Sequence, residues 1–146
     1  MHVVVGSDHA GYKLKEHLKE RLTAWGHEVE DVGTHSTDSC DYPTFGVAVG
    51  ERVIALGGQG RGVAVCGSGI GISIAANRIA GVRAALVSEP TAARLSRQHN
   101  DANVLCFGER LIGVAVAEES LRVWLETPFE GGRHARRVAL LDADRR

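Results

Sequence analysis

The sequence contains few cysteines, and they form no cluster. Cys40, Cys66 and Cys106 are odd in number and far apart, and none belongs to a C-x-x-C pair or to a zinc-finger spacing with histidine. This arrangement disfavours a disulfide framework and a structural metal site, so we expect no metal.

Long apolar runs are also missing. No window approaches the roughly 18 apolar residues of a membrane span, and the first residues lack the basic segment and apolar core of an export signal. We therefore expect no membrane association and a cytoplasmic location.

Neither sign of charge predominates. The chain has 17 Lys and Arg against 18 Asp and Glu, a formal net charge of -1. Such a balance gives no general attraction for nucleic acid, so any anionic ligand must be bound by local groups. With 146 residues, 44% of them hydrophobic and 24% charged, the chain fits one folded domain spanning residues 1–146.

Apolar strand-like runs alternate with helical patterns along the chain. The predicted strands are His2–Gly6, His27–Val32, Gly62–Cys66, Val82–Val87 and Asn103–Phe107. The predicted helices are Tyr12–Trp25, Pro43–Leu56 (weakened by Gly46 and Gly50), one beginning near Ile70, Pro90–His99 and Val114–Leu125. This alternation predicts an α/β fold in which helices cover both faces of a parallel sheet.

The tail after Phe129 has a different character. Gly131 and Gly132 break the chain, and four basic residues follow, before an apolar pattern that predicts a last helical segment over 138–141. The basic group is Arg133, His134, Arg136 and Arg137. It is either a solvated face or a phosphate-binding group, since arginine donates paired hydrogen bonds to phosphate.

In open parallel sheets, ligands bind beyond the carboxyl ends of the strands. Asp8 and His9 follow the first predicted strand, Cys66 ends the third, and Glu109 and Arg110 follow the fifth. If the first and third strands are neighbours, these groups converge on one edge of the sheet.

Cys66 begins the most informative stretch, VAVCGSGIGISIAA over 63–76, in which glycine recurs at 67, 69 and 71. Glycine lets several amides point into one space at the start of a helix, where anions and thiolates are favoured. The loop is not G-x-G-x-x-G, lacks the Gly-Lys-Ser/Thr of a nucleotide loop, and has Ile72 where a cysteine phosphatase has arginine. It therefore predicts a general oxyanion site with a thiol beside it.

Taken singly, several of these residues have plainer interpretations. A free cysteine is most often a small buried residue. We adopt that interpretation for Cys106 and expect no role for Cys40 in its polar loop, whereas the glycine loop favours a functional role for Cys66. For His9 and His99, a position on the surface and a functional role agree equally well with the sequence.

Several blocks of the sequence resemble the type B ribose-5-phosphate isomerases and the related galactose- and allose-phosphate isomerases. The matching blocks, within residues 6–137, are GSDHAGYKLK, DVGT, DYP, VCGSGIGISIAANRIAGVRAA, SEPTAARLSRQHNDANVL, FGER and EGGRHARR. The resemblance implies a Rossmann-like three-layer α/β/α sandwich with a five-stranded parallel sheet, and no metal or nucleotide cofactor. It further implies a homodimer, without deciding between dimers and tetramers, in which the tail 131–146 contributes to sites at the subunit interface.

The resemblance also implies roles for individual residues. Cys66 is the base that moves a proton between the two carbons adjoining the carbonyl; members that lack this cysteine use a glutamate at the position of Ile72. Asp8 and His99 assist ring opening, and Ser68 lies near the exchanging hydroxyl protons. The implied substrate-binding residues are His9, Tyr42, Gly67, Gly69, Ile70, Gly71, Asn100, Arg110, Arg133, His134 and Arg137. The arginines hold phosphate, and the amides of 67–71 hold a cis-enediolate.

The predicted activity is interconversion of ribose 5-phosphate and ribulose 5-phosphate. The alternatives are isomerisation of another phosphorylated sugar, namely an allose, galactose or tetrulose phosphate, and a non-catalytic phosphosugar-binding subunit. A cysteine hydrolase using Cys66 and His99 is a further alternative.

Overall fold

The computed structural model describes residues 1–143; positions 144–146 of the predicted tail lie outside the described residues. The elements are β1 (His2–Ser7), η1 (His9–Gly11), α1 (Tyr12–Ala24), β2 (Glu28–Asp31), α2 (Tyr42–Ala55), η2 (Gly57–Gln59), β3 (Gly60–Cys66), α3 (Ile70–Ala76), β4 (Ala84–Leu86), α4 (Pro90–Asn100), β5 (Val104–Gly108), α5 (Val114–Glu126) and α6 (Arg133–Asp142). All predicted strands are present, although β4 is shorter than the run Val82–Val87.

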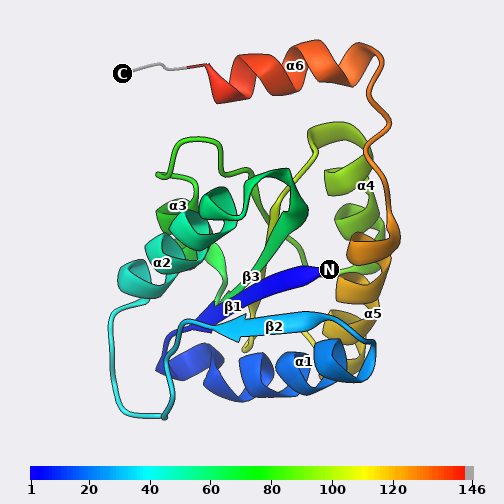
Figure 1. The fold of residues 1–146 in the computed structure, drawn as a ribbon. Helices are drawn as coiled ribbons and strands as arrows, with labels where there is room; N and C mark the ends of the chain where they lie inside the picture. The colour runs from blue at the N-terminus through cyan, green and yellow to red at the C-terminus, as the bar shows by residue number, and fades with distance from the viewer. Residues whose placement is uncertain (144–146) are drawn as a thin grey trace.

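The five strands form one parallel sheet in the order β2-β1-β3-β5-β4. β3 lies at its centre, between β1 and β5. Figure 1 shows β1 between β2 and β3. β2 pairs with one side of β1, and the chain then crosses to β3 on the other side of β1. The strand order therefore reverses between β1 and β3, and in such sheets ligands bind in the crevice at the carboxyl ends of these two strands. The predicted adjacency of the first and third strands is confirmed.

Alternate residues of the buried strands face two separate cores. Val63 and Val65 of β3 pack with α1, α4 and α5, whereas Ala64 and Cys66 pack with α2 and α3. The result is the expected three-layer α/β/α sandwich, with both sheet faces covered. Among the described residues, no helix has the length and apolar character needed to cross a bilayer.

The glycines of α2 have a packing role that the sequence analysis did not foresee. A methyl group on Gly46 would lie 2.8 Å from the carbonyl oxygen of Ile72, and one on Gly50 would lie 3.0 Å from Ile79. These glycines therefore allow α2 to pack closely against α3 and the segment after it, instead of interrupting the helix.

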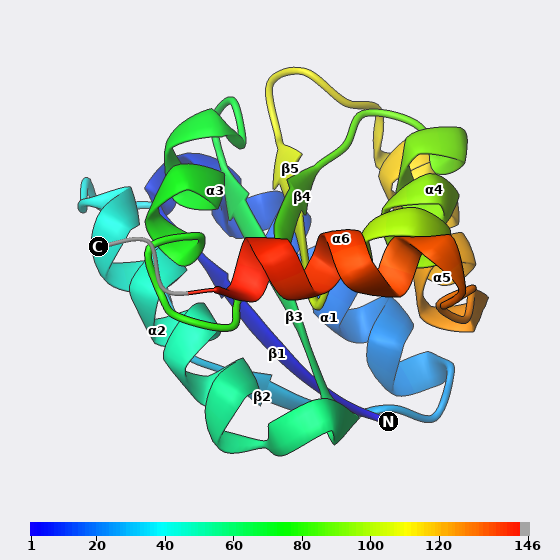
Figure 2. The same ribbon diagram turned by 90° about the horizontal axis from the view of Figure 1, so that it is seen from above.

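α6 corrects the expectation for the tail. The helix begins at Arg133 and not near Val138, so the basic residues lie on its first turns. α6 lies at the outside of the domain, where it contacts α4 and crosses toward the α3 side (Figure 2). Of its residues, His134 and Val138 are buried against the protein, and most of the others are exposed.

Candidate active site at the carboxyl edge of the sheet

Backbone hydrogen bonds join the ends of β1, β3 and β5. The N–H of Asp8 donates to Val65, that of Glu109 donates to Cys66 at 2.9 Å, and that of Arg110 donates to Gly67 at 3.0 Å. The three segments that follow these strands are therefore held together, as the strand-end argument predicted.

Cys66 ends β3 with only 4% of its surface exposed. Its sulfur accepts a hydrogen bond from the N–H of Gly69 at 3.1 Å. Gly69 has φ of 76°, and a methyl group there would collide with Leu86 and with the backbone of β5, so the position requires glycine. An amide donor at the start of a helix favours negative charge on the sulfur.

The other two notable positions near Cys66 are apolar and buried. Ile72, on α3, is fully buried in the core that α2 and α3 share. Burial raises the pKa of the Cys106 thiol, and the charge of Cys66 raises it further. Cys106 is therefore the buried core residue that was expected, whereas Cys66 borders the glycine loop.

The glycine loop uses some of its amides internally. Besides the bond from Gly69 to sulfur, the N–H of Ile70 donates to the Oγ of Ser68 at 3.2 Å. Within residues 1–143, this leaves the amides of Gly67, Ser68 and Gly71 for an external anion. Fewer loop amides are therefore available to a ligand than the sequence pattern alone predicts.

Asp8 is buried and oriented by the turn that follows it. Its Oδ1 accepts hydrogen bonds from the amides of Ala10 and Gly11, both at 3.0 Å. Oδ2 makes no hydrogen bond within residues 1–143. One oxygen therefore fixes the carboxylate, and the other is available to a ligand.

The loop after β2 and the first residue of α2 contact two of the predicted residues, His9 and Gly71. The ring of Tyr42 packs on Gly71, where an added methyl group would lie 2.6 Å from the ring. The N–H of Cys40 donates to Nδ1 of His9 at 3.2 Å, and the Cys40 sulfur lies 4.0 Å from the same nitrogen. The backbone of Cys40 thus fixes the ring of His9, a contact that has no local signal in the sequence because the two residues are 31 positions apart.

Arg110 lies over the glycine loop, since a methyl group on Gly67 would lie 3.1 Å from its Nη1. The preceding residue anchors it: Glu109 Oε1 accepts a hydrogen bond from the N–H of Leu14 at 2.6 Å, at the start of α1. Glu109 follows the end of β5, as predicted, but its bond to α1 has no signal in the sequence.

The remaining predicted residues form a second group on α4 and α6. The rings of His99 and His134 stack at 4.4 Å between centroids and 14° between planes. Burial lowers the pKa of His134, and the charges of His99 and Arg133 lower it further. Asn100 ends α4, and Arg133 and Arg137 lie one turn apart on α6 with their side chains exposed.

The two groups lie at opposite ends of the strands, the first at their carboxyl ends and the second at their amino ends. In the parallel register, Val104 pairs with Gly62, four residues before Cys66, so β5 begins about 13 Å from Cys66 along the strands. His99 precedes Val104 by five residues and lies beyond that end. A single chain therefore does not bring His99, or the arginines near it, to Cys66.

His99, Glu130 and His134 also form a possible cation-binding group, with ligand atoms within 4.8 Å of one another. Two observations disfavour a metal there. The ring planes are nearly parallel, so in-plane lone pairs of the two rings lie in separate planes and do not readily meet at one point. The positive charges of Arg133 and Arg137 also act on His134 and oppose a bound cation.

The chain is similar to known sugar-phosphate isomerases over almost its whole length. The model of a family described as Ribose/Galactose Isomerase matches residues 3–141. Ribose-5-phosphate isomerase B of Escherichia coli is 45% identical, over 97% of this chain and 94% of that protein. The ribose-5-phosphate isomerase B structure from Clostridium thermocellum is 48% identical, with a TM-score of 0.94 over 97% and 95% of the two chains. That from Mycoplasma genitalium, with bound ribulose-5-phosphate, is 37% identical, with a TM-score of 0.94 over 97% and 93%.

Proposed function

The chain belongs to the ribose/galactose isomerase family, and we propose that it is an aldose-ketose isomerase that interconverts ribose 5-phosphate and ribulose 5-phosphate. The observation that carries this proposal is the buried thiol of Cys66, with an amide donor on its sulfur, beside the loop amides and the free oxygen of Asp8. Aldose-ketose isomerisation needs a base for one carbon-bound proton and donors for the oxygens of the resulting enediolate.

The proton transfers can be assigned to these groups. Cys66 as thiolate removes the C2 proton of the open-chain aldose, and the electron pair moves to give a cis-enediolate. The loop amides of Gly67, Ser68 and Gly71 stabilise its charge, and the Ser68 hydroxyl moves the proton between O1 and O2. Cys66 then returns its proton to C1, which gives the ketose. Every step is a proton transfer, so the reaction requires no cofactor.

Ring opening and phosphate binding require the second group of residues. We propose a homodimer in which His99 of the partner subunit, together with Asp8, opens the furanose ring, and in which the partner's Asn100 contacts the sugar. Arg110 and His9 of one subunit, with Arg133, His134 and Arg137 of the partner subunit, bind the phosphate. The placement of the two groups at opposite ends of the strands supports this, because only a second copy can supply one group to the other.

Exposed apolar side chains support the same association. Ile70 and Ile74 on α3 are 52% and 60% exposed, and Leu86 on the edge strand β4 is 42% exposed. They lie close to the glycine loop, and a second copy of the chain packed there would remove them from water.

Complementation between two inactive variants tests the composite site. Cys66→Ala and Arg137→Ala damage different groups, so each homodimer has two defective sites. In a mixed dimer both defects fall in one site and the other is intact, so an equimolar mixture should recover about one quarter of wild-type turnover. No recovery after demonstrated subunit exchange would contradict the composite site but not the isomerase activity.

A coupled assay of the wild-type protein tests the activity itself. Ribose 5-phosphate should be turned over with the highest kcat/KM, and the panel should include galactose 6-phosphate and allose 6-phosphate because the family description names galactose as well. Binding of these sugars without turnover of any of them would instead favour the non-catalytic subunit.

A further inference from the structure

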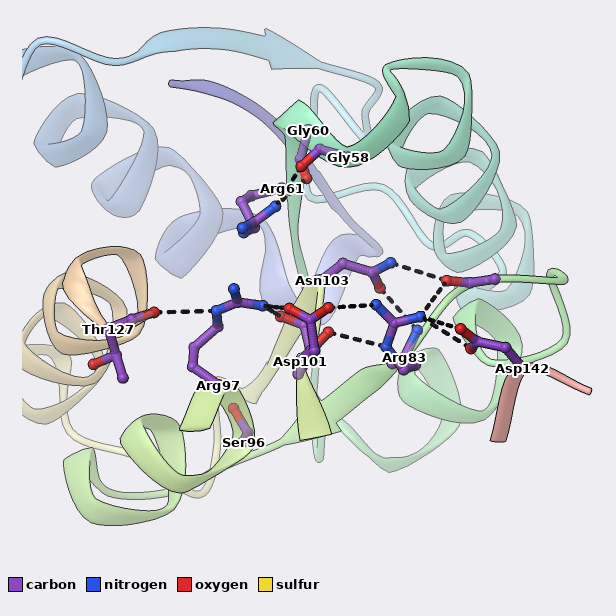
Figure 3. A network of polar contacts seen from close by, with 12 residues as sticks. Gly58, Gly60, Arg61, Arg83, Ser96, Arg97, Asp101, Asn103, Thr127 and Asp142 are labelled. Atoms are coloured by element: carbon purple, nitrogen blue, oxygen red, sulfur yellow. Dashed lines mark hydrogen bonds and ion pairs between the residues drawn. The ribbon is translucent and has the colours of Figure 1, made fainter. Parts of the chain in front are cut away.

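A network of polar contacts joins the end of α4 to the end of α6 (Figure 3). Arg83 lies at its centre, in the segment before β4. Its Nη2 donates to Asp101 Oδ2 at 3.2 Å, and its Nη1 donates to both carboxylate oxygens of Asp142 at 2.9 Å. One guanidinium therefore links the residue that follows α4 with the last residue of α6.

Asp101 is the residue at which the chain turns out of α4, directly after His99 and Asn100. It has φ of 48°, a left-handed conformation that is uncommon for residues other than glycine. Arg97, only 4% exposed, donates to Asp101 Oδ1 at 2.8 Å and to the carbonyl oxygen of Ala102 at 2.7 Å. The carboxylate of Asp101 thus secures the last turn of α4, on which His99 and Asn100 stand.

Asp142 secures the far end of α6. At the near end, the N–H of Glu130 donates to the carbonyl oxygen of Gln98 at 3.1 Å, and His134 stacks on His99. Toward the far end, a cavity of about 430 Å³ lies between Leu141 of α6, Asn100 and the start of β4. The bonds from Arg83 to Asp142 tie this end of the helix to the segment before β4, beside the cavity.

We propose that Asp101 and Asp142, joined through Arg83, are positioning residues for the group of side chains that one subunit contributes to the active site of its partner. Asp101 orients His99 and Asn100, and Asp142 orients the helix that carries Arg133, His134 and Arg137. Neither carboxylate touches the substrate. The inference rests on the proposed function, because it assigns a purpose to the geometry of that site.

The two halves of the network affect different kinetic parameters. Asp142→Asn frees the end of the phosphate-binding helix, so KM for ribose 5-phosphate should rise about three- to tenfold with kcat within about twofold of wild type. Asp142→Glu keeps a carboxylate and should restore KM. Asp101→Asn loosens His99 and Asn100, so kcat should fall about tenfold.

A further measurement separates positioning from loss of folded protein. Exchange of a C1 proton of ribulose 5-phosphate with deuterated water requires Cys66 but no ring opening. Asp101→Asn should therefore reduce turnover of ribose 5-phosphate more than it reduces this exchange, whereas partial unfolding would reduce both equally.

Arg52→Gln is the matched control. It breaks an ion pair to Glu30, in which Arg52 Nε lies 2.6 Å from the carboxylate. The side chain of Glu30 is about as exposed as that of Asp142, and the pair lies outside the proposed site. Arg52→Gln should therefore leave kcat and KM unchanged. Wild-type KM and kcat per folded molecule in both Asp142→Asn and Asp101→Asn would overturn the positioning role while the isomerase activity stands. An inactive wild-type protein would instead show that the proposed function itself is wrong.

Discussion

The sulfur of Cys66 accepts a hydrogen bond from the backbone N–H of Gly69, 3.1 Å away, at the point where β3 gives way to α3. This bond ties the chemistry of the thiol to the conformation of the glycine loop. Gly69 can present its N–H in this direction because it adopts a positive φ. The same turn that directs the loop amides therefore also places a hydrogen-bond donor on the sulfur of Cys66.

Replacement of Cys66 by alanine should stop catalysis without preventing binding. Loss of a general base typically costs about 100- to 10,000-fold, so kcat should fall into that range while the Kd for ribose 5-phosphate, measured by calorimetry, stays within a few-fold. Cys106→Ala is the control, since that thiol is buried in the core, and its kcat per folded molecule should match wild type. Near-normal turnover in Cys66→Ala would remove the thiol from the mechanism.

Gly71→Ala should impair activity without lowering stability. The new methyl group would meet the ring of Tyr42 at 2.6 Å, and that exposed ring can swing away from the site. Alanine also favours the helix by up to about 1 kcal/mol, so the melting temperature should be unchanged or higher while kcat/KM falls. In a Tyr42→Ala background, Gly71→Ala should have no further effect on kcat/KM.

The matched control for that experiment is Gly58→Ala, where an added methyl group meets no atom within 4 Å. It should leave kcat/KM unchanged. Equal losses from Gly71→Ala in the presence and absence of Tyr42 would show that the tyrosine ring is not the cause.

Glu109→Gln tests the anchor behind Arg110. The carboxylate accepts the Leu14 N–H at 2.6 Å at the positive end of α1, so loss of its charge should lower the free energy of unfolding by about 1 kcal/mol. Displacement of Arg110 should also raise KM. Glu20→Gln, on the exposed side of α1, is the control. It should change neither the free energy of unfolding, measured in urea, nor KM, measured in kinetic assays.

The stability of the protein should fall as the pH drops from 7.5 to 5.5. Burial lowers the pKa values of His27 and His134 below the ordinary 6.5, so the unfolded chain binds more protons than the folded chain near that pH. Stability then rises with pH through this window and is lost on acidification. The lowered carboxyl pKa values, such as that of Asp31, act below about pH 4 and so do not interfere.

Thermal unfolding of His134→Gln across the same window checks the assignment. This variant should show a smaller fall in melting temperature than wild type, because one of the two histidines has been removed. His35→Gln, in the exposed loop, should keep the wild-type slope. An unchanged slope in His134→Gln would show that His134 does not contribute to this pH dependence.

Much of the fold and half of the site were predictable because their signals are local. The unit from Val63 to Ala76 is contiguous, so β-branched residues, a cysteine and spaced glycines indicate a strand, a turn and a helix without reference to the rest of the chain. The alternation of strands and helices likewise predicts a parallel sheet, and the sheet in turn predicts which strand ends carry ligand-binding residues.

Tertiary structure alone decided how the distant segments combine. The contact of Cys40 with His9 and that of Glu109 with Leu14 join residues 31 and 95 positions apart, and no periodicity reports such pairs. The division of the site between the two ends of the strands depends on strand order and register, which come from packing of the whole core. The sequence by itself determined which residues we propose for the chemistry, and the folded geometry decided that one chain holds them as two separate groups, because His99 lies at the end of a helix that runs back from the carboxyl ends of the strands, where Cys66 lies.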